Sequence, residues 1–165
     1  MTVSPIGGGD LSSEEFGDEG PIPFQYPSYF SCSNVYTLTA LPDTESGYVF
    51  DYWTIQTATG TTVSSSTAIT VPVAEDKTVT AHFVDPTTVI SVYYPHVTTR
   101  SPWQTEIALV NTSSNQAVTG VLKAFSDTGT LVEIKDITLA RNGRRQIIVA
   151  SEFSRHAEIG YFVFV

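Results

Sequence analysis

Apolar and polar side chains alternate along the chain from Val35 onward. Tyr36, Leu38 and Ala40 fall on one side of this pattern, and threonines lie between them. A period of two predicts a strand with one buried face, so the first half of the chain predicts a small half-buried sheet. A turn is expected near Gly60. The expected strands cover residues 35–42, about 48–56, about 68–73 and 78–84.

A second alternating series begins after Pro86, with turn residues between most of its members. Arg141-Asn142-Gly143 is a strong signal for a tight hairpin, and residues 151–156 are expected to form one helical turn. Several short strands at this spacing predict an immunoglobulin-like β-sandwich over residues 87–165. The expected strands cover residues 88–94, 103–111, 117–125, 130–139, 145–150 and 159–165.

Residues from about 7 to 29 interrupt the pattern. They are rich in Gly, Pro and acidic side chains and show no periodicity, so a long acidic loop is expected. Clustered carboxylates raise the alternative of a calcium site, but their spacing does not fit an EF-hand loop. A solvated loop is the favoured interpretation.

Composition supports an all-β protein, because charged residues are only 15% and Thr, Ser, Val and Tyr are abundant. Charge is uneven: residues 1–86 hold eleven acids against Lys77 alone, a balance of −10, while residues 87–165 hold six acids and seven bases, a balance of +1. This shift predicts two modules, residues 1–86 and 87–165. The acidic half argues against nucleic acid as a partner.

Cys32 is the only cysteine, which excludes an intrachain disulfide and gives no support to redox or thiolate chemistry. No apolar run is long enough for membrane insertion, and residues 1–9 lack the features of a signal peptide. The chain is expected to be either cytosolic or a piece of a longer precursor.

Three blocks in the first module resemble a known family: residues 36–43, the run Gly47-Tyr48-Val49-Phe50-Asp51-Tyr52-Trp53, and residues 78–83. Over about residues 35–84 they are similar, in sequence and order, to the divergent internalin B-repeat, or bacterial repeat, domain. The resemblance implies a compact β-grasp-like fold, and a spacer or adhesive role on secreted or wall-attached bacterial proteins. It implies no catalytic residue. It also implies that an opening strand before Pro5 is cut away, since such modules begin with a strand that ends in a similar turn.

The second module resembles uncharacterised immunoglobulin-like domains of exported bacterial proteins. The similarity lies in residues 95–96, 103–112 and 123–129 and in the run 137–145. It implies no activity. Such domains usually continue past a Gly-Tyr-x-Val-Phe strand, so the resemblance implies truncation at the C-terminal end.

No catalytic or metal constellation emerges from the sequence. The three histidines, His82, His96 and His156, lie in separate segments without zinc spacing, and His82 is expected to point outward from a sheet edge. There is no Gly-x-Ser-x-Gly elbow, and the acids cluster in loops rather than as a glycosidase pair. We therefore expect that the chain is not an enzyme and holds no cofactor or metal. A hydrolase is the third hypothesis, after a structural or adhesive module and a carbohydrate-binding module.

Two groups of side chains are candidates for ligand binding. Tyr93, Tyr94, His96 and Trp103 lie around one loop; if exposed, their rings can stack on sugars, and the alternative is that they plug the end of the sandwich. Tyr48, Phe50 and Trp53, by contrast, are expected to pack in the core of the first module. A second candidate group, Arg141, Arg144 and Arg145, offers guanidinium groups to an anion, against solvated charge on a hairpin tip.

The sequence thus predicts a non-catalytic structural or adhesive module pair of an exported, extracellular or cell-surface bacterial protein. Its expected partners are neighbouring domains and a glycan or a host or cell-surface protein. The alternative is a carbohydrate-binding accessory module of a secreted enzyme. An open strand edge is expected to pair with another strand, which also allows a homo-oligomer.

Overall fold

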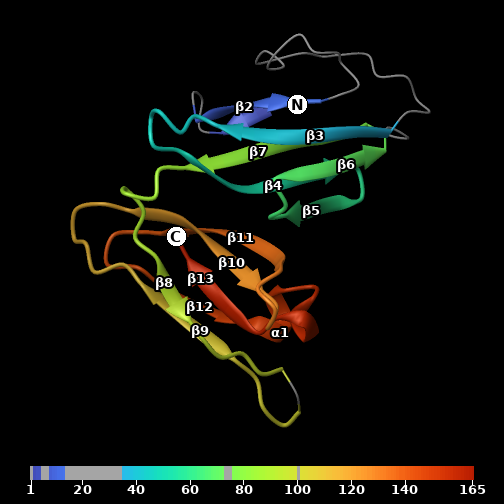
Figure 1. The fold of residues 1–165 in the computed structure, drawn as a ribbon. Coiled ribbons are helices and arrows are strands. Elements are labelled where there is room, and N and C mark those ends of the chain that lie inside the picture. Colours follow the sequence, from blue (N-terminus) through green and yellow to red (C-terminus); the bar gives the residue numbers. More distant parts are fainter. Residues whose placement is uncertain (1, 5–7, 14–34, 73–75, 100) are drawn as a thin grey trace. The chain divides into compact units, whose positions relative to one another are not determined.

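The computed structural model describes residues 2–4, 8–13, 35–72, 76–99 and 101–165, with the backbone alone for residues 2–4. The fold is all-β, as the sequence predicts (Figure 1). The chain divides into two compact units, and the boundary lies between Val89 and Ile90. The immunoglobulin-like and β-grasp-like assignments of the units stay predictions.

The first unit consists of two sheets around one core. One sheet has the order β1-β7-β4-β5 and the other the order β2-β3-β6. Leu11, Leu38 and Ile69 from the second sheet meet Trp53 and Phe83 from the first in a single buried cluster. Its strands are β1 (Thr2–Ser4), β2 (Gly9–Ser12), β3 (Val35–Pro42), β4 (Val49–Thr57), β5 (Gly60–Ser64), β6 (Ala68–Pro72) and β7 (Thr78–Val84).

Alternation along the chain gives the observed burial of this unit. Tyr36, Leu38 and Ala40 on β3 are buried, as expected. The register between β4 and β7 shifts at Asp51, which is the extra residue of a bulge. Because the bulge breaks the period of two, the neighbouring Tyr52 and Trp53 are both buried.

Aromatic packing in the first unit matches the prediction. Trp53 is fully buried and its Nε1 donates a hydrogen bond to the Ser66 carbonyl at 2.9 Å. Tyr48 and Phe50 are partly buried and pack against the same core.

Three expectations for the first unit are wrong. The segment 7–29 was expected to be irregular throughout, yet β2 lies within it, because pairing with β3 buries Leu11. Residues 14–29 of that loop, with their acidic run, lie outside the described part of the chain. A strand is present before Pro5, since β1 pairs in parallel with β7. That pairing also places His82 on an interior strand rather than at a sheet edge.

The second unit also encloses one core between two sheets, one of order β11-β10-β13-β8 and the other of the pair β12-β9. Leu122, Ile137 and Phe162 from the larger sheet pack with Ile107 and Ile147 from the smaller one. All six expected ranges contain a strand. The elements are β8 (Val92–Tyr94), β9 (Glu106–Val110), β10 (Val118–Phe125), β11 (Leu131–Leu139), β12 (Arg144–Ile148), α1 (Val149–Glu152), the 3-10 turn η2 (His156–Glu158) and β13 (Tyr161–Phe164).

The predicted hairpin at Arg141-Asn142-Gly143 is wrong, although the turn itself is present. Asn142 adopts a left-handed conformation with φ of 52°, and Gly143 N donates to the Ala140 carbonyl at 2.9 Å. However, β11 pairs with β10 and β12 pairs with β9. The turn therefore carries the chain from one sheet to the other instead of joining two paired strands.

Candidate functional site

The loop between β8 and β9 carries the most exposed aromatic ring of the candidate group. Trp103 on this loop has 71% of its surface exposed, and Tyr93 on β8 has 67%. Tyr94 instead packs partly buried against the core, and this burial raises the pKa of its phenol. Successive strand residues face opposite sides, so Tyr93 and Tyr94 cannot form one platform. The structure therefore leaves Tyr93 and Trp103 exposed and turns Tyr94 toward the core.

This loop is closed at its base by one threonine side chain. Thr105 Oγ1 accepts a hydrogen bond from Thr98 N at 2.8 Å and donates one to the Thr98 carbonyl at 3.0 Å. Val97 packs against the core beside Tyr94. The loop leaves the two sheets of its unit and projects beyond the strand ends (Figure 1). Its base is thus fixed while Trp103 faces solvent, an arrangement for which the sequence holds no signal because it depends on a contact between loop ends.

The histidines remain apart from one another. His96 is exposed beside the loop, while His82 stacks on the Tyr52 ring at 4.4 Å and its Nε2 lies 3.0 Å from Thr54 Oγ1. His156 lies on η2, and its Nδ1 is buried without a hydrogen-bond partner. No group of three or more His, Cys, Asp or Glu side chains that could hold a metal occurs among the described residues.

The three candidate arginines do not form one anion site. Arg141 and Arg144 are exposed around the turn at Asn142. Arg145 is bound: its Nη2 donates to Glu152 Oε2 at 3.0 Å. The group that could meet an anion is reduced to two solvated guanidinium groups.

Glu152 forms a polar clamp that sequence spacing does not reveal. Its Oε2 accepts a second hydrogen bond from Lys135 Nζ at 2.9 Å. The bonds from Lys135 and then Arg145 lower the pKa of the Glu152 carboxyl. Lys135 also lies over the Phe153 ring, 5.2 Å from its centroid. Because the three ionic side chains come from β11, β12 and α1, the clamp fixes α1 against both sheets.

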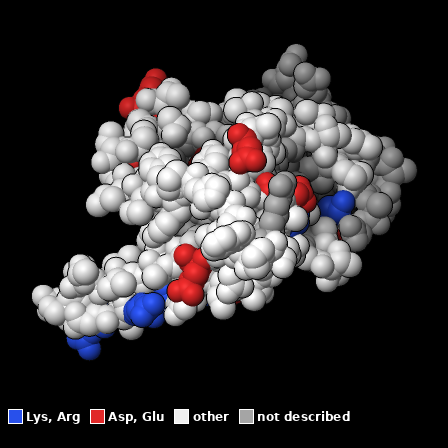
Figure 2. All heavy atoms as spheres, turned by 90° about the horizontal axis from the view of Figure 1, so that it is seen from below, with Lys and Arg blue, Asp and Glu red and all other residues white. Residues whose placement is uncertain are grey.

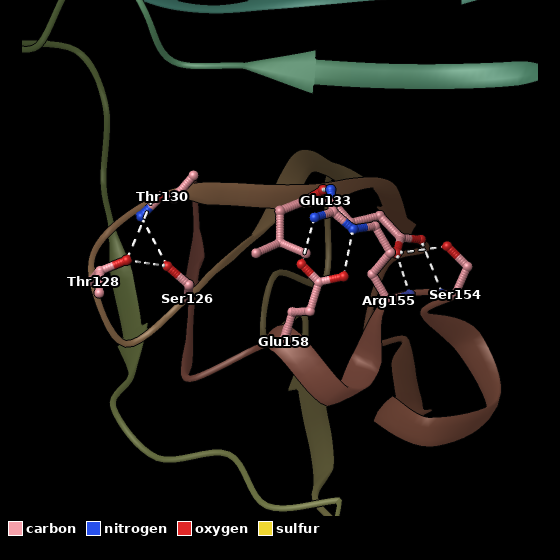
Figure 3. A network of polar contacts seen from close by, with 8 residues as sticks. Ser126, Thr128, Thr130, Glu133, Ser154, Arg155 and Glu158 are labelled. Carbon is pink, nitrogen blue, oxygen red and sulfur yellow. Dashed lines mark hydrogen bonds and ion pairs between the residues drawn. The ribbon is translucent and has the colours of Figure 1, made fainter.

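A second polar network holds the segment after α1 (Figure 3). Glu133 on β11 accepts hydrogen bonds from Ser154 Oγ at 3.1 Å and from Arg155 N at 3.2 Å. Arg155 Nε donates to Glu158 Oε1 at 2.9 Å, and its Nη1 donates to the Val132 carbonyl at 3.2 Å. Each of these groups already has a hydrogen-bond partner within the fold, so the network is structural.

The first unit has one further concavity to consider, an open groove of about 730 Å³ beside the β4–β5 turn. Four of its nine lining residues are threonines, and Asp76 and Lys77 are its only charged ones. Thr57 Oγ1 lies 3.0 Å from Thr59 Oγ1 and donates to the Gly60 carbonyl at 3.2 Å. These hydroxyls are satisfied locally, and the groove brings no reactive pair together.

Charged side chains are sparse on the face drawn in Figure 2. Acidic and basic side chains lie singly or in small groups over a mostly uncharged face in Figure 2. A nucleic-acid interface needs clustered basic side chains, and the figure shows no broad basic area on that face. None of the helices in the described part of the chain has the length and apolarity needed to cross a membrane.

Comparison with protein families gives one match. Residues 1–86 match the family model described as the divergent InlB B-repeat domain. Neither curated proteins nor solved structures give a match.

Proposed function

We propose that this chain, which belongs to the divergent InlB B-repeat domain family through residues 1–86, is a non-catalytic spacer or adhesive module of a bacterial surface or secreted protein. The family is typical of bacterial surface proteins and suggests a structural role. The proposal assigns no reaction to the chain. Its partners are neighbouring domains of a longer protein and a glycan or protein on a cell surface.

The pairing of the first and last strands of the first unit carries this proposal. Thr2, Val3 and Ser4 of β1 lie in parallel register with Thr80, Ala81 and His82 of β7. Tension applied through the chain pulls β1 toward its start and β7 toward its end. Parallel neighbours then slide past each other, so all the hydrogen bonds between them are loaded together. Such shear resists force better than peeling, which breaks the bonds in turn.

The second unit is loaded in the other way. Its first strand, β8, is antiparallel to its last, β13, with Val92 opposite Phe164. The two points of attachment are thus at the same end of the pair, and tension peels the strands apart. We expect the second unit to open at lower force and the first to persist as the stiff element.

Pulling single molecules of the whole chain by its termini tests the proposal. Unfolding under force is governed by the unfolding rate, so the barrier in each unit is read directly. Two rupture events are expected, with the first unit giving the higher force. The chain length released per event identifies the unit, at up to about 3.6 Å per residue. A first unit that opens before the second, or at negligible force, would refute a load-bearing role.

Exposure of Trp103 favours a second candidate function, binding of a glycan. Covering about 100 Å² of an aromatic ring with a sugar face contributes about 2.5 kcal/mol at 25 cal/mol per Å². Ser101 and Gln104 flank the ring in the loop and are exposed, so polar groups lie near it for hydroxyl recognition.

A glycan array, followed by calorimetry on any hit, tests this second candidate. Trp103→Ala is expected to abolish binding, and Tyr94→Phe, which removes a hydroxyl from a ring packed on the core, serves as the control. Absence of binding to every glycan, or equal binding by Trp103→Ala, would remove the candidate and leave the structural role untouched.

A further inference from the structure

The smaller sheet of the second unit has an edge without a partner. β9 and β12 pair with each other over five residues each, and with no other strand in the described part of the chain. On β9, Ile107 and Leu109 are buried in the core, while Glu106, Ala108 and Val110 are exposed. A strand that ends a sheet in this way offers its backbone groups to a further strand.

The hydrogen bonds at the two ends of β9 show which groups face the open edge. The Thr105 carbonyl accepts from Val149 N at 3.1 Å, and Asn111 N donates to the Gly143 carbonyl at 2.8 Å. Bonded pairs alternate along an antiparallel ladder, so Ile107 and Leu109 also bond to β12. Glu106, Ala108 and Val110 therefore direct their N–H and C=O groups away from β12. In the described part of the chain, no backbone hydrogen bond from another segment reaches them.

Side chains guard this edge at one position only. Proteins usually protect an edge strand with charged side chains, Pro or a bulge, and the only such feature of β9 is Glu106 at its first position. β12 at the opposite edge carries Arg144 and Arg145. β8, the short edge strand of the larger sheet, offers only three residues.

We propose that β9 pairs antiparallel with β9 of a second copy of this chain, centred on Ala108. In this register Ala108 lies opposite Ala108, and Glu106 lies opposite Val110 of the second copy. Each is a pair whose backbone groups face the shared edge, so the hydrogen-bonding pattern of the two strands matches. The sheets of the two copies join as β12-β9-β9-β12, and Ile107 and Leu109 stay on the core side.

Charge complementarity favours a second copy as the occupant. Arg144 on β12 lies opposite Val110 on β9. In the proposed register the next residue of that row is Glu106 of the second copy, and the two-fold symmetry repeats the row. The long side chain of Arg144 can thus reach across Val110 toward the Glu106 carboxylate of the second copy. The two Glu106 carboxylates lie at opposite ends of the joined strands and do not face each other.

Sedimentation equilibrium of the whole chain from about 1 to 500 μM tests the proposal through the linkage between association and concentration. The wild type is expected to dimerise. Ala108→Pro removes an N–H that faces the open edge without removing a bond to β12. It takes two bonds from the symmetric dimer and is expected to raise the dissociation constant at least about 30-fold. Ala108→Thr keeps the N–H and is expected to dimerise like the wild type.

Charge reversal provides a second arm that leaves the backbone intact. Glu106→Lys or Arg144→Glu alone is expected to weaken the dimer about tenfold, and the double reversal to restore it, because each exposed pair acts twice in the dimer. This arm decides alone if circular dichroism shows that Ala108→Pro is unfolded. The proposal would be overturned by a monomeric wild type, or by an Ala108→Pro dimer as tight as that of Ala108→Thr. It would also be overturned if the double-reversal variant had a higher dissociation constant than both single variants.

Discussion

Replacing Asn111 tests whether a single buried amide holds one end of the second unit together. The side chain follows β9 and is only 4% exposed. Its Nδ2 donates to the Gln116, Leu139 and Ala140 carbonyls at 2.8, 3.3 and 3.0 Å. Its Oδ1 accepts from Ser113 N at 2.9 Å. One amide therefore links the end of β9 to the following loop and to the end of β11.

The magnitude follows from the groups that lose a partner. The amide has two N–H donors shared among three carbonyls, and one acceptor in use. The two donors and the acceptor count as three hydrogen bonds of about 1 kcal/mol each, and the buried carbonyls left unpaired add part of their desolvation cost. Asn111→Ala is therefore expected to lower the free energy of unfolding by about 3–4 kcal/mol. Asn111→Asp keeps the acceptor and loses both donors, so we expect a loss at least as large.

Urea denaturation followed by circular dichroism measures this loss, with hydrogen exchange assigning it to residues 90–165. Thr112→Ala at the exposed neighbouring position is the matched control and is expected to change stability by less than about 0.5 kcal/mol. A loss below about 1 kcal/mol for Asn111→Ala would refute the reasoning, since it would mean that water satisfies the freed carbonyls.

Three other perturbations probe the two cores and the clamp at α1. Trp53→Ala empties the centre of the first core and is expected to cost about 3–5 kcal/mol in urea denaturation, whereas a cost below about 1 kcal/mol would contradict its burial. Gly120→Ala places a Cβ 2.4 Å from the Val165 carbonyl oxygen and is expected to cost about 1–3 kcal/mol; a variant as stable as the wild type would show that β10 and the last residue do not lie so close. Glu152 has a folded pKa below its ordinary value of 4.5, chiefly through Lys135, so its contribution is present above about 4.5 and lost as pH falls through the folded pKa. Glu152→Gln is expected to flatten the acid limb of a stability profile, and an unchanged limb would speak against the clamp.

The sequence predicts strands here better than it predicts their partners. Alternation marks β3 and β7 because burial of every second side chain is a local property of each strand. It cannot mark β2, whose glycine-rich segment becomes a strand through pairing with β3 and burial of Leu11. Nor can it show that the turn at Asn142 crosses between sheets, because the same dipeptide suits a hairpin and a crossover.

The candidate site also combines features that the sequence predicts with features that it cannot predict. Aromatic content locates Tyr93, Tyr94 and Trp103, but their exposure depends on which face of β8 meets the core and on the closure of the loop by Thr105. Arg145 belongs to the clamp through Glu152, seven positions away in sequence and on a different element. Such contacts arise from tertiary packing and leave no periodic signal.

Whether the β1–β7 pair resists tension can be tested by changing only the direction of pull. Attachment at the N-terminus and at Asp76→Cys, just before β7, with Cys32→Ser to leave one thiol, peels β1 from β7 instead of shearing them. If the parallel pair carries the load, rupture of the first unit through the native termini needs a clearly higher force than rupture through this second attachment. Equal forces in the two directions would contradict the account.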